Sequence, residues 1–202
     1  MKASRRQFVR GLGLAATALL STSASAQEPA EKVARDAPRA NLQAVVILVR
    51  HTEKSTDDRV DPSLSEEGVA RAKELARLVG SNGVTSLLHT EYKRTRDTLA
   101  PLAQALSLKS ETIGANEMPK LIERLRSAKA REVIAVAGHS NTIPAIAYAL
   151  GVTLPDLDPI PKGSKAPHGY LPHGAYDRVH VLTPGPNGAS LVELRYGAQS
   201  EG

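Results

Sequence analysis

The sequence predicts an α/β domain, a three-layer α/β/α sandwich around a mainly parallel central sheet. Segments rich in β-branched residues alternate with segments whose apolar residues recur at helical spacing, which is the pattern of parallel sheets. Two of the apolar segments end in a histidine: residues 44–49 lead into Arg50 and His51, and residues 132–137 lead into Gly138 and His139. Because ligands bind beyond the carboxyl ends of strands in open α/β sheets, both histidines are expected to face one pocket.

The first 26 residues have the layout of an export signal. A basic start with the adjacent Arg5 and Arg6 precedes an apolar middle at residues 11–20, and residues 24–26 form a small-residue cleavage site. The paired arginines indicate the twin-arginine route, and hence a periplasmic or secreted protein. The apolar middle is shorter than the roughly 20 residues that span a bilayer, so no stable membrane insertion is expected after cleavage.

Cleavage would change the charge of the protein. The whole chain has 26 Lys and Arg against 21 Asp and Glu, and four of the basic residues but none of the acidic ones lie in the first 26 residues. The mature chain therefore carries 22 basic and 21 acidic residues, and its charge does not imply a nucleic-acid partner. The absence of Cys from the sequence excludes a thiol nucleophile and a zinc-thiolate site.

Residues 27–41, rich in Ala, Pro and charge, are predicted to be a flexible lead-in, and residues 42–202 one domain with a sizeable core. The expected strands are residues 45–49, 86–89, 132–137, 179–183 and 190–196, the last two forming a hairpin around a turn at 184–188. The expected helices are one that Ser65 caps and that ends at 80–83, then 94–106, 119–127 and 143–150. Pro101 predicts a kink or early break in the second helix. Residues 151–177 are expected to be a long functional or mobile loop.

Three strand ends carry the residues that suggest chemistry: Arg50-His51-Thr52, residues 90–98 with Arg94, and Gly138-His139-Ser140-Asn141. Together they resemble the histidine phosphatase superfamily, also called phosphoglycerate mutase-like. The marks of that family are Arg-His-Gly or Arg-His-Thr after the first strand, an arginine in a Ser-x-x-x-Arg-Thr-x-x-Thr-like segment, and Gly-His after a late strand. Residues 64–68 also match the family pattern, and the resemblance covers about residues 42–196. It implies a phosphoglycerate mutase-like fold of the compact phosphatase type.

The resemblance implies that His51 is the nucleophile of a phosphoryl transfer, and the chemistry agrees. A neutral imidazole can attack phosphorus with one ring nitrogen while the other donates to a carbonyl oxygen, giving a phosphohistidine that water later opens. Guanidinium and imidazolium donors stabilise the charge on the transferred group, which is the role expected of Arg50, Arg94 and His139. The predicted substrate-binding residues, which add neutral donors, are Thr52, Ser140 and Asn141.

The acid that protonates the leaving group is not assigned by the motifs. Many members of the family place a glutamate some two dozen residues beyond the second arginine, and Glu117 lies near that position; an ordinary helix start explains it equally well. Glu53, two residues from the nucleophile, is the rival candidate. Other members have Asp after the second histidine, where this chain has Ser140.

No metal site and no cofactor are predicted, since His168, His173 and His180 lack ligand spacing on a shared element. The leading hypothesis is a metal-independent phosphomonoesterase that acts on a small phosphorylated substrate. A catalytically silent phosphate-binding or scaffold protein of the same fold is the alternative. A phosphoglycerate mutase is a third option, which the short chain and the export signal disfavour.

Overall fold

The computed structural model describes residues 43–164, 166, 168–185 and 188–200. The predicted export signal at 1–26 and the lead-in at 27–41 lie outside the described residues, as do positions 186–187 of the predicted turn. No helix within the described ranges is long and apolar enough to cross a membrane.

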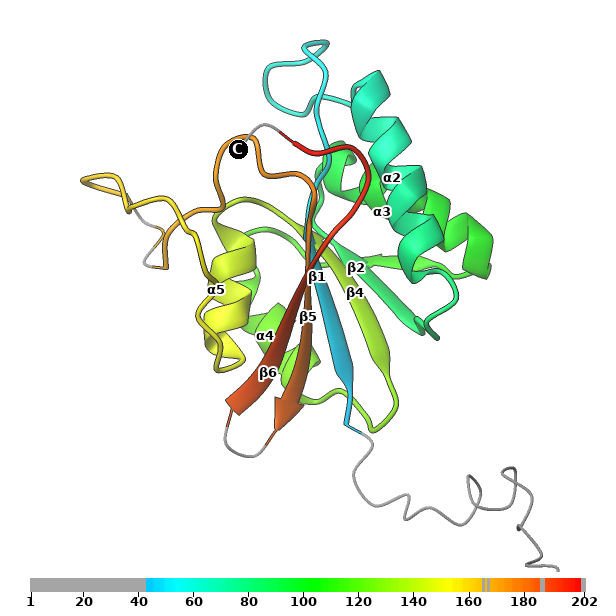
Figure 1. Cartoon of the computed structure of the whole chain (residues 1–202), viewed down its shortest axis with the longest axis vertical. Coiled ribbons are helices and arrows are strands. Elements are labelled where there is room, and N and C mark those ends of the chain that lie inside the picture. Colours follow the sequence, from blue (N-terminus) through cyan, green and yellow to red (C-terminus); the bar gives the residue numbers. More distant parts are fainter. Residues whose placement is uncertain (1–42, 165, 167, 186–187, 201–202) are drawn as a thin grey trace, which may run out of the picture. The chain divides into compact units, whose positions relative to one another are not determined.

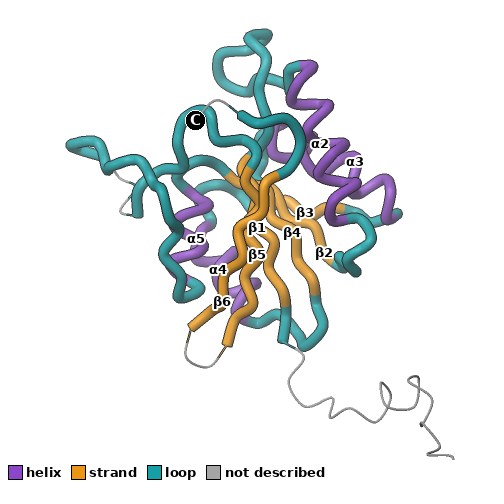
Figure 2. The backbone as a smooth tube through the Cα atoms, in the orientation of Figure 1, coloured by secondary structure: helices purple, strands orange, loops and turns teal. Residues whose placement is uncertain are grey.

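In the part of the chain that the structure describes, six strands form one sheet in the order β3-β2-β4-β1-β5-β6 (Figures 1 and 2). They are β1 (Val45–Arg50), β2 (Ser86–His89), β3 (Ser110–Thr112), β4 (Val133–Gly138), β5 (Arg178–Gly185) and β6 (Gly188–Arg195). Strand β4 pairs in parallel with both β1 and β2, and β2 with β3, whereas β5 is antiparallel to β1 and to β6. The predicted α/β fold with a mainly parallel sheet is therefore confirmed, with an antiparallel hairpin at one edge.

Among the described residues, four helices cover the two faces of the sheet: α2 (Glu66–Val79), α3 (Lys93–Leu106), α4 (Met118–Arg126) and α5 (Thr142–Ala149). Alternate residues of β1 point to opposite faces. Val49 belongs to the core cluster that contains apolar residues of α2 and α3, and Leu48 to the cluster that contains those of α4 and α5. The helices thus form the two outer layers of the predicted sandwich, as Figure 1 shows.

Local signals explain where the helices begin and continue. The hydroxyl of Ser65 accepts from the Gly68 N–H and caps α2, as predicted. The early break expected at Pro101 does not occur, because α3 continues to Leu106. Leu99 and Leu102 on either side of the proline are fully buried, and their packing offsets the missing main-chain hydrogen bond. Strand β3 was not predicted, since its three residues show no apolar alternation.

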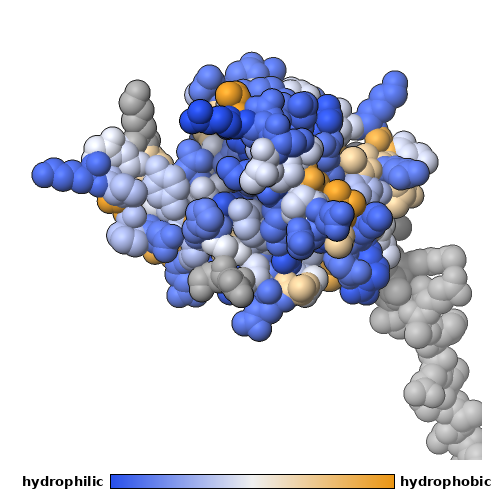
Figure 3. Space-filling view, turned by 90° about the horizontal axis from the view of Figure 1, so that it is seen from above, coloured by the Kyte–Doolittle hydropathy of each residue, from blue (hydrophilic) through white to orange (hydrophobic). Residues whose placement is uncertain are grey.

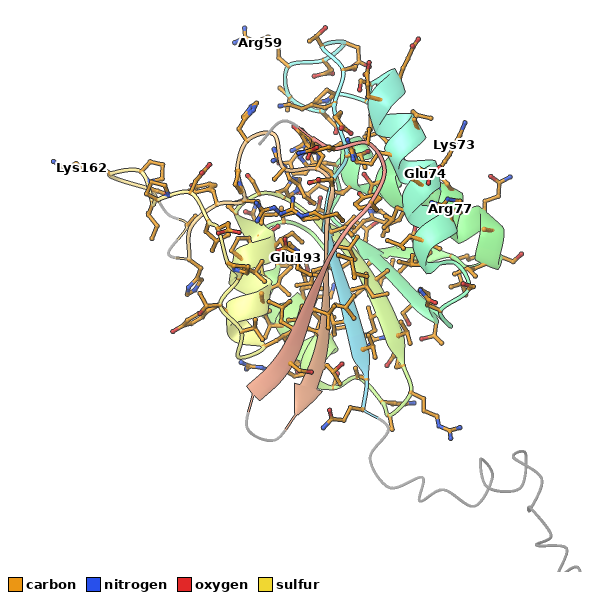
Figure 4. The ribbon with its side chains drawn as sticks, in the orientation of Figure 1. Arg59, Lys73, Glu74, Arg77, Lys162 and Glu193 are labelled. Carbon is orange, nitrogen blue, oxygen red and sulfur yellow. The ribbon has the colours of Figure 1, made fainter. Side chains whose placement is uncertain are left out.

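The carboxyl ends of β1, β2 and β4 lie together at one end of the strands, which is the upper end in Figure 1. Viewed from that end, the surface is largely hydrophilic (Figure 3). Two connections border it, residues 51–65 and residues 151–177. Arg59 and Lys162 lie at the outer tips of these connections and point away from the domain (Figure 4). The predicted strand-end residues are therefore gathered at a polar edge.

Candidate active site

The ring of His51, directly after β1, is held by the main chain in one tautomer. The main-chain N–H of His51 donates to the carbonyl oxygen of Gly138 at 2.8 Å, and the ring Nδ1 lies 2.8 Å from the carbonyl oxygen of Thr52. Because a carbonyl oxygen only accepts, Nδ1 carries the proton and Nε2 keeps its lone pair. Burial, with repulsion from Arg50, lowers the pKa of His51 to about 3. The imidazole is therefore neutral at neutral pH, as a nucleophile must be.

His139, after β4, faces His51 with ring centroids 5.4 Å apart. The Thr95 hydroxyl donates to the Tyr92 carbonyl oxygen at 2.8 Å, which leaves the Thr90 hydroxyl to donate to Thr95 Oγ1 at 2.8 Å. Thr90 Oγ1 then accepts from His139 Nε2 at 3.0 Å. Burial, followed by the charge of Arg94, lowers the pKa of His139 to about 4. His139 is thus neutral, with its proton on Nε2 and a lone pair on Nδ1.

Arg50 at the end of β1 is a buried cation whose partners are neutral. Its Nη1 donates to the carbonyl oxygens of Pro172 at 2.9 Å and His173 at 2.8 Å, and Nη2 lies 3.4 Å from the Tyr176 hydroxyl. The guanidinium carbon also lies 4.3 Å from the centroid of the Tyr176 ring. Nε has no acceptor within the described part of the chain. The positive charge of Arg50 is therefore not neutralised by any of these contacts.

Tyr176 is a site residue that the sequence patterns do not indicate. Its ring lies 6.1 Å from that of His51 and packs on Arg50, so it contacts two predicted catalytic residues at once. It belongs to the connection 151–177, whose last part holds Arg50 through main-chain carbonyls. The only hint in the sequence is the expectation that so long a connection has a function.

Arg94 brings a second guanidinium to the site from the first turn of α3. Its guanidinium carbon lies 4.2 Å from the centroid of the Tyr92 ring, and its nearest acidic group is Asp61, at 3.9 Å. The charge of Arg94 contributes to the lowered pKa of both His51 and His139. The structure thus brings together the four residues predicted as nucleophile and cradle.

The threonines around the arginine motif fix these side chains. Thr52 N–H donates to Thr98 Oγ1 at 3.0 Å, and the Thr98 hydroxyl donates to the Arg94 carbonyl oxygen at 2.7 Å. This chain of bonds ties the segment after His51 to the helix that carries Arg94. The Thr52 hydroxyl, predicted to bind substrate, is fully buried and donates to the Gly68 carbonyl oxygen at 2.9 Å. Thr52 therefore holds the main chain around the site in place, and its hydroxyl does not face the substrate.

Ser140 and Asn141 lie between β4 and α5. The carbonyl oxygen of Ser140 accepts from the Leu171 N–H at 2.8 Å, which joins this turn to the connection 151–177. Asn141 is exposed at the N-cap of α5, and its side chain makes no capping hydrogen bond. The Thr142 hydroxyl accepts from the His139 N–H at 2.7 Å and fixes the turn. Ser140 and Asn141, two of the three predicted substrate-binding residues, thus follow His139 at a helix N-terminus.

The two predicted acids are both engaged elsewhere. Both carboxylate oxygens of Glu53 accept from Arg71 Nε, at 2.8 and 3.0 Å. Glu117 accepts from the Gly114 N–H at 2.8 Å and lies 3.4 Å from Lys120 Nζ. The Gly114 N–H and then Lys120 lower the pKa of Glu117 below its ordinary value, so its carboxylate stays ionised at neutral pH.

The remaining histidines are spread over the fold. His168 stacks on Tyr148 with ring centroids 4.0 Å apart, and His180 is buried 3.2 Å from Glu193 Oε2. His173 contributes its carbonyl oxygen to Arg50. Across the described ranges, no three or more His, Cys, Asp or Glu side chains are grouped so that they could hold a metal ion.

Solved structures similar to this fold include phosphatases, and three illustrate the similarity. The SixA structure from Nakamurella multipartitia, a candidate phosphohistidine phosphatase, is 21% identical, with a TM-score of 0.53, covering 77% of this chain and 97% of that one. The protein histidine phosphatase SixA complexed with tungstate is 15% identical, with a TM-score of 0.52 and coverages of 75% and 96%. A mycobacterial glucosyl-3-phosphoglycerate phosphatase with inorganic phosphate is 16% identical, with a TM-score of 0.54 and coverages of 76% and 97%.

The sequence itself also matches a family model. Residues 46–118 match the model of the histidine phosphatase superfamily (branch 1), a segment that contains Arg50, His51 and Arg94. The resemblance predicted from the motifs is therefore confirmed, and the comparisons support the predicted enzyme class, a phosphatase. A comparison with curated proteins found no match.

Proposed function

We propose that this protein is a metal-independent phosphomonoesterase that works through a phosphohistidine on His51. One observation carries the proposal: the Nδ1–H of His51 is bonded to the Thr52 carbonyl oxygen, so the Nε2 lone pair is free beside Arg50, Arg94 and His139. A nucleophile surrounded by cationic and hydrogen-bonding groups matches the needs of phosphoryl transfer.

In the first half of the reaction, Nε2 of His51 attacks phosphorus and the ester oxygen leaves with the electron pair of the P–O bond. Arg50 and Arg94 bind the equatorial oxygens, whose charge persists through a loose transition state. A bound phosphate dianion favours protonation of His139 at Nδ1, because an adjacent anion stabilises the imidazolium. In the second half, water attacks the phosphohistidine, and phosphate and neutral His51 are released.

Partly buried arginine side chains account for the affinity of such a site for phosphate. Arg50 is 7% exposed and its protein contacts are carbonyl oxygens and a tyrosine, so an anion is the partner that its charge lacks. Interactions between charges are stronger at such a site than in bulk water. The neighbours complexed with tungstate and with phosphate bind oxyanions, which agrees with this assignment.

A panel of phosphomonoesters tests the proposal. In the presence of a chelator, the protein should release phosphate from at least one ester, and rapid acid-free quenching should trap an acid-labile phosphoenzyme. His51→Ala should abolish both, whereas His168→Ala, which alters a histidine stacked on Tyr148, should leave both unchanged. Turnover that survives His51→Ala, or that requires a divalent metal, would falsify the mechanism. Phosphate binding without turnover on any ester would instead identify the silent phosphate-binding protein.

The panel should sample different kinds of small phosphorylated compounds. Similar structures are named for activity on a phosphohistidine and on glucosyl-3-phosphoglycerate, so a phosphohistidine peptide and a sugar-linked phosphoglycerate belong in it. Glycerol phosphate and 4-nitrophenyl phosphate provide an alkyl and an aryl leaving group. We place this activity in the periplasm or outside the cell, on the basis of the paired Arg5 and Arg6 and the cleavage site at residues 24–26.

A further inference from the structure

We propose that Glu91 is the acid that protonates the leaving group, an inference that rests on the proposed phosphatase function. Glu91 was not among the acids predicted from sequence. It directly follows Thr90, at the carboxyl end of β2. Three observations lead to this assignment: the position of Glu91 in the site, the single hydrogen bond of its carboxylate, and the hydrogen bonds and ion pairs that hold the two rival acids.

The two chain neighbours of Glu91 both contact His139. Thr90 Oγ1 lies 3.0 Å from His139 Nε2, and the ring of Tyr92 meets the His139 ring edge-on with centroids 5.4 Å apart. Glu91 is thus fixed beside one of the two active-site histidines. The electrostatic effect of its carboxylate on His139, which raises the pKa of that histidine against the larger effect of burial, agrees with this proximity.

The sheet places Glu91 on the side of the site opposite His51. The strands run in the order β2-β4-β1, so the turn with Glu91 and the end with His51 flank the end with His139. In an in-line displacement, the leaving oxygen departs from the face of phosphorus opposite the nucleophile. A proton donor must therefore lie across the phosphate from His51, which is the side where Glu91 is found.

The carboxylate of Glu91 is anchored by one oxygen only. Oε2 accepts from the Ala115 N–H at 2.8 Å, which ties the side chain to the connection after β3. Within the part of the chain that the structure describes, Oε1 has no hydrogen-bond donor, and the side chain is exposed. One oxygen is thus held in place while the other can carry the proton.

The two rival acids lack this freedom. Glu53 is held by a bidentate contact with the buried Arg71, and it follows His51 on the nucleophile's own strand end. Glu117 is half-exposed, and both of its oxygens are engaged, by the Gly114 N–H and by Lys120. Giving up a proton and taking it back would require either carboxylate to lose these interactions.

The proposed steps balance as follows. When Nε2 of His51 bonds to phosphorus, the P–O bond breaks, and the leaving oxygen takes its electron pair and the proton of the Glu91 carboxyl. The products of this step are the free alcohol, phosphohistidine and ionised Glu91. Water then attacks phosphorus, its proton passes to the Glu91 carboxylate, and the N–P electron pair returns to His51.

Glu91→Gln tests the role, because the amide cannot donate a proton as an acid yet its oxygen can still accept from the Ala115 N–H. With glycerol phosphate, whose alkoxide is a poor leaving group, kcat/KM should fall by about 10²-fold or more. With 4-nitrophenyl phosphate, kcat/KM should fall by less than about fivefold, because nitrophenolate leaves without a proton. Glu91→Asp should retain part of the activity on glycerol phosphate.

Glu117→Gln is the matched control, since Glu117 anchors the same connection through the Gly114 N–H. It should keep kcat/KM for both esters within about threefold of the original protein, the variation expected without a lost proton transfer. The inference is overturned if Glu91→Gln lowers kcat/KM equally for both esters or for neither of them. It is also overturned if Glu117→Gln has the same effect as Glu91→Gln. If the original protein hydrolyses no member of the panel, or His51→Ala retains activity, the proposed function itself fails; these results differ from a failure of Glu91 alone.

Discussion

The rings of His51 and His139 meet edge-on, with centroids 5.4 Å apart and an interplanar angle of 63°. Two cations at this separation, flanked by Arg50 and Arg94, would repel one another strongly. Burial and the arginines accordingly lower the pKa of His51 to about 3 and that of His139 to about 4. The site is therefore built with two neutral imidazoles, and its positive charge comes from the guanidinium groups.

This arrangement predicts a loss of stability in mild acid. Between pH 6.5 and about 4, the unfolded chain protonates both histidines while the folded chain does not, so the free energy of unfolding falls as the pH is lowered. Each histidine contributes up to about 1.4 kcal/mol per pH unit in this window, and the contribution is fully present above pH 6.5. Urea denaturation at pH 7, 6 and 5 would measure the slope.

His139→Gln should reduce this slope, because the glutamine does not titrate. Burial also lowers the pKa of His180, so the comparison between variants is more informative than the slope alone. An unfolding free energy that stays constant from pH 7 to pH 5 would contradict the neutral state of both active-site histidines. Chemical shifts of the His51 ring that titrate near pH 6.5 would do the same.

The contact between Tyr176 and Arg50 predicts a role for the tyrosine in phosphate binding. Tyr176→Ala removes the ring that packs on the guanidinium and should raise the Kd for inorganic phosphate by about twofold to 30-fold, the value of a cation–π contact of about 0.5–2 kcal/mol. Tyr176→Phe keeps the ring and loses only a long 3.4 Å hydrogen bond, so its effect should be small. Calorimetric titration with phosphate would measure both.

Tyr148→Ala is the control for that experiment, because the Tyr148 ring stacks on His168 and not on Arg50, His51, Arg94 or His139. It should leave phosphate binding unchanged. Equal affinities of the Tyr176→Ala variant and the original protein would show that Arg50 keeps its orientation through the carbonyl oxygens of Pro172 and His173 alone.

The ion pair of Glu53 and Arg71 predicts a stability effect without a catalytic one. Arg71 is 6% exposed, so Glu53→Gln would leave a buried cation without an anionic partner, bonded to the new amide oxygen and to the carbonyl oxygens of Tyr196 and Ala198. We expect the free energy of unfolding to fall by about 2–3 kcal/mol, below the full cost of breaking a buried pair because these acceptors remain. Urea denaturation would measure it.

Activity of the same variant separates the two roles once considered for Glu53. At a temperature where the variant stays folded, kcat/KM for glycerol phosphate should remain within about threefold of the original value, since no proton transfer is lost. A loss of about 10²-fold with unchanged stability would instead identify Glu53 as the acid.

The predicted cradle was readable in the sequence because each member is tied to a strand end. A parallel sheet brings the carboxyl ends of β1, β2 and β4 to one edge, so Arg50, His51 and His139 converge once the strands are recognised. Arg94 follows from its place in the first turn of the next helix. Short-range order in the sequence thus determines this part of the site.

Other contributions depend on contacts between distant segments and leave no local pattern. The Tyr176 ring reaches Arg50 across 126 positions of the chain, and Thr52 is bonded to Thr98 across 46. Glu91 stands in a recognised motif, yet its side chain is anchored by a main-chain N–H 24 residues later. Such partners become visible only when the tertiary fold is known.

Gly68 shows a packing constraint that the family-like motif at residues 64–68 only hinted at. An added Cβ at this position would lie 2.1 Å from the carbonyl oxygen of Glu53, which also accepts from the Ser65 N–H. Gly68→Ala must therefore push the start of α2 away from the segment after His51, and should destabilise the protein by more than about 3 kcal/mol. Thermal or urea unfolding would measure the loss.

Gly83→Ala provides the comparison, because Gly83 has a positive φ of 71° but no atom within 4 Å of an added Cβ. It should cost only the strain of the left-handed conformation, about 1–2 kcal/mol. If the two substitutions were equally costly, close packing at Gly68 would not be the cause of its effect.

The paired arginines near the start of the chain predict how the protein reaches its compartment. Arg5→Lys combined with Arg6→Lys keeps the charge of the basic segment and removes the feature that the twin-arginine route requires. In a bacterial host with that route, the original chain should be recovered from the periplasm, shortened by the first 26 residues, and the double variant from the cytoplasm at full length. Mass spectrometry of the two fractions would distinguish the products. Periplasmic recovery of the double variant at the original level would contradict the twin-arginine assignment, and an uncleaved chain in the membrane fraction would contradict cleavage after Ala26.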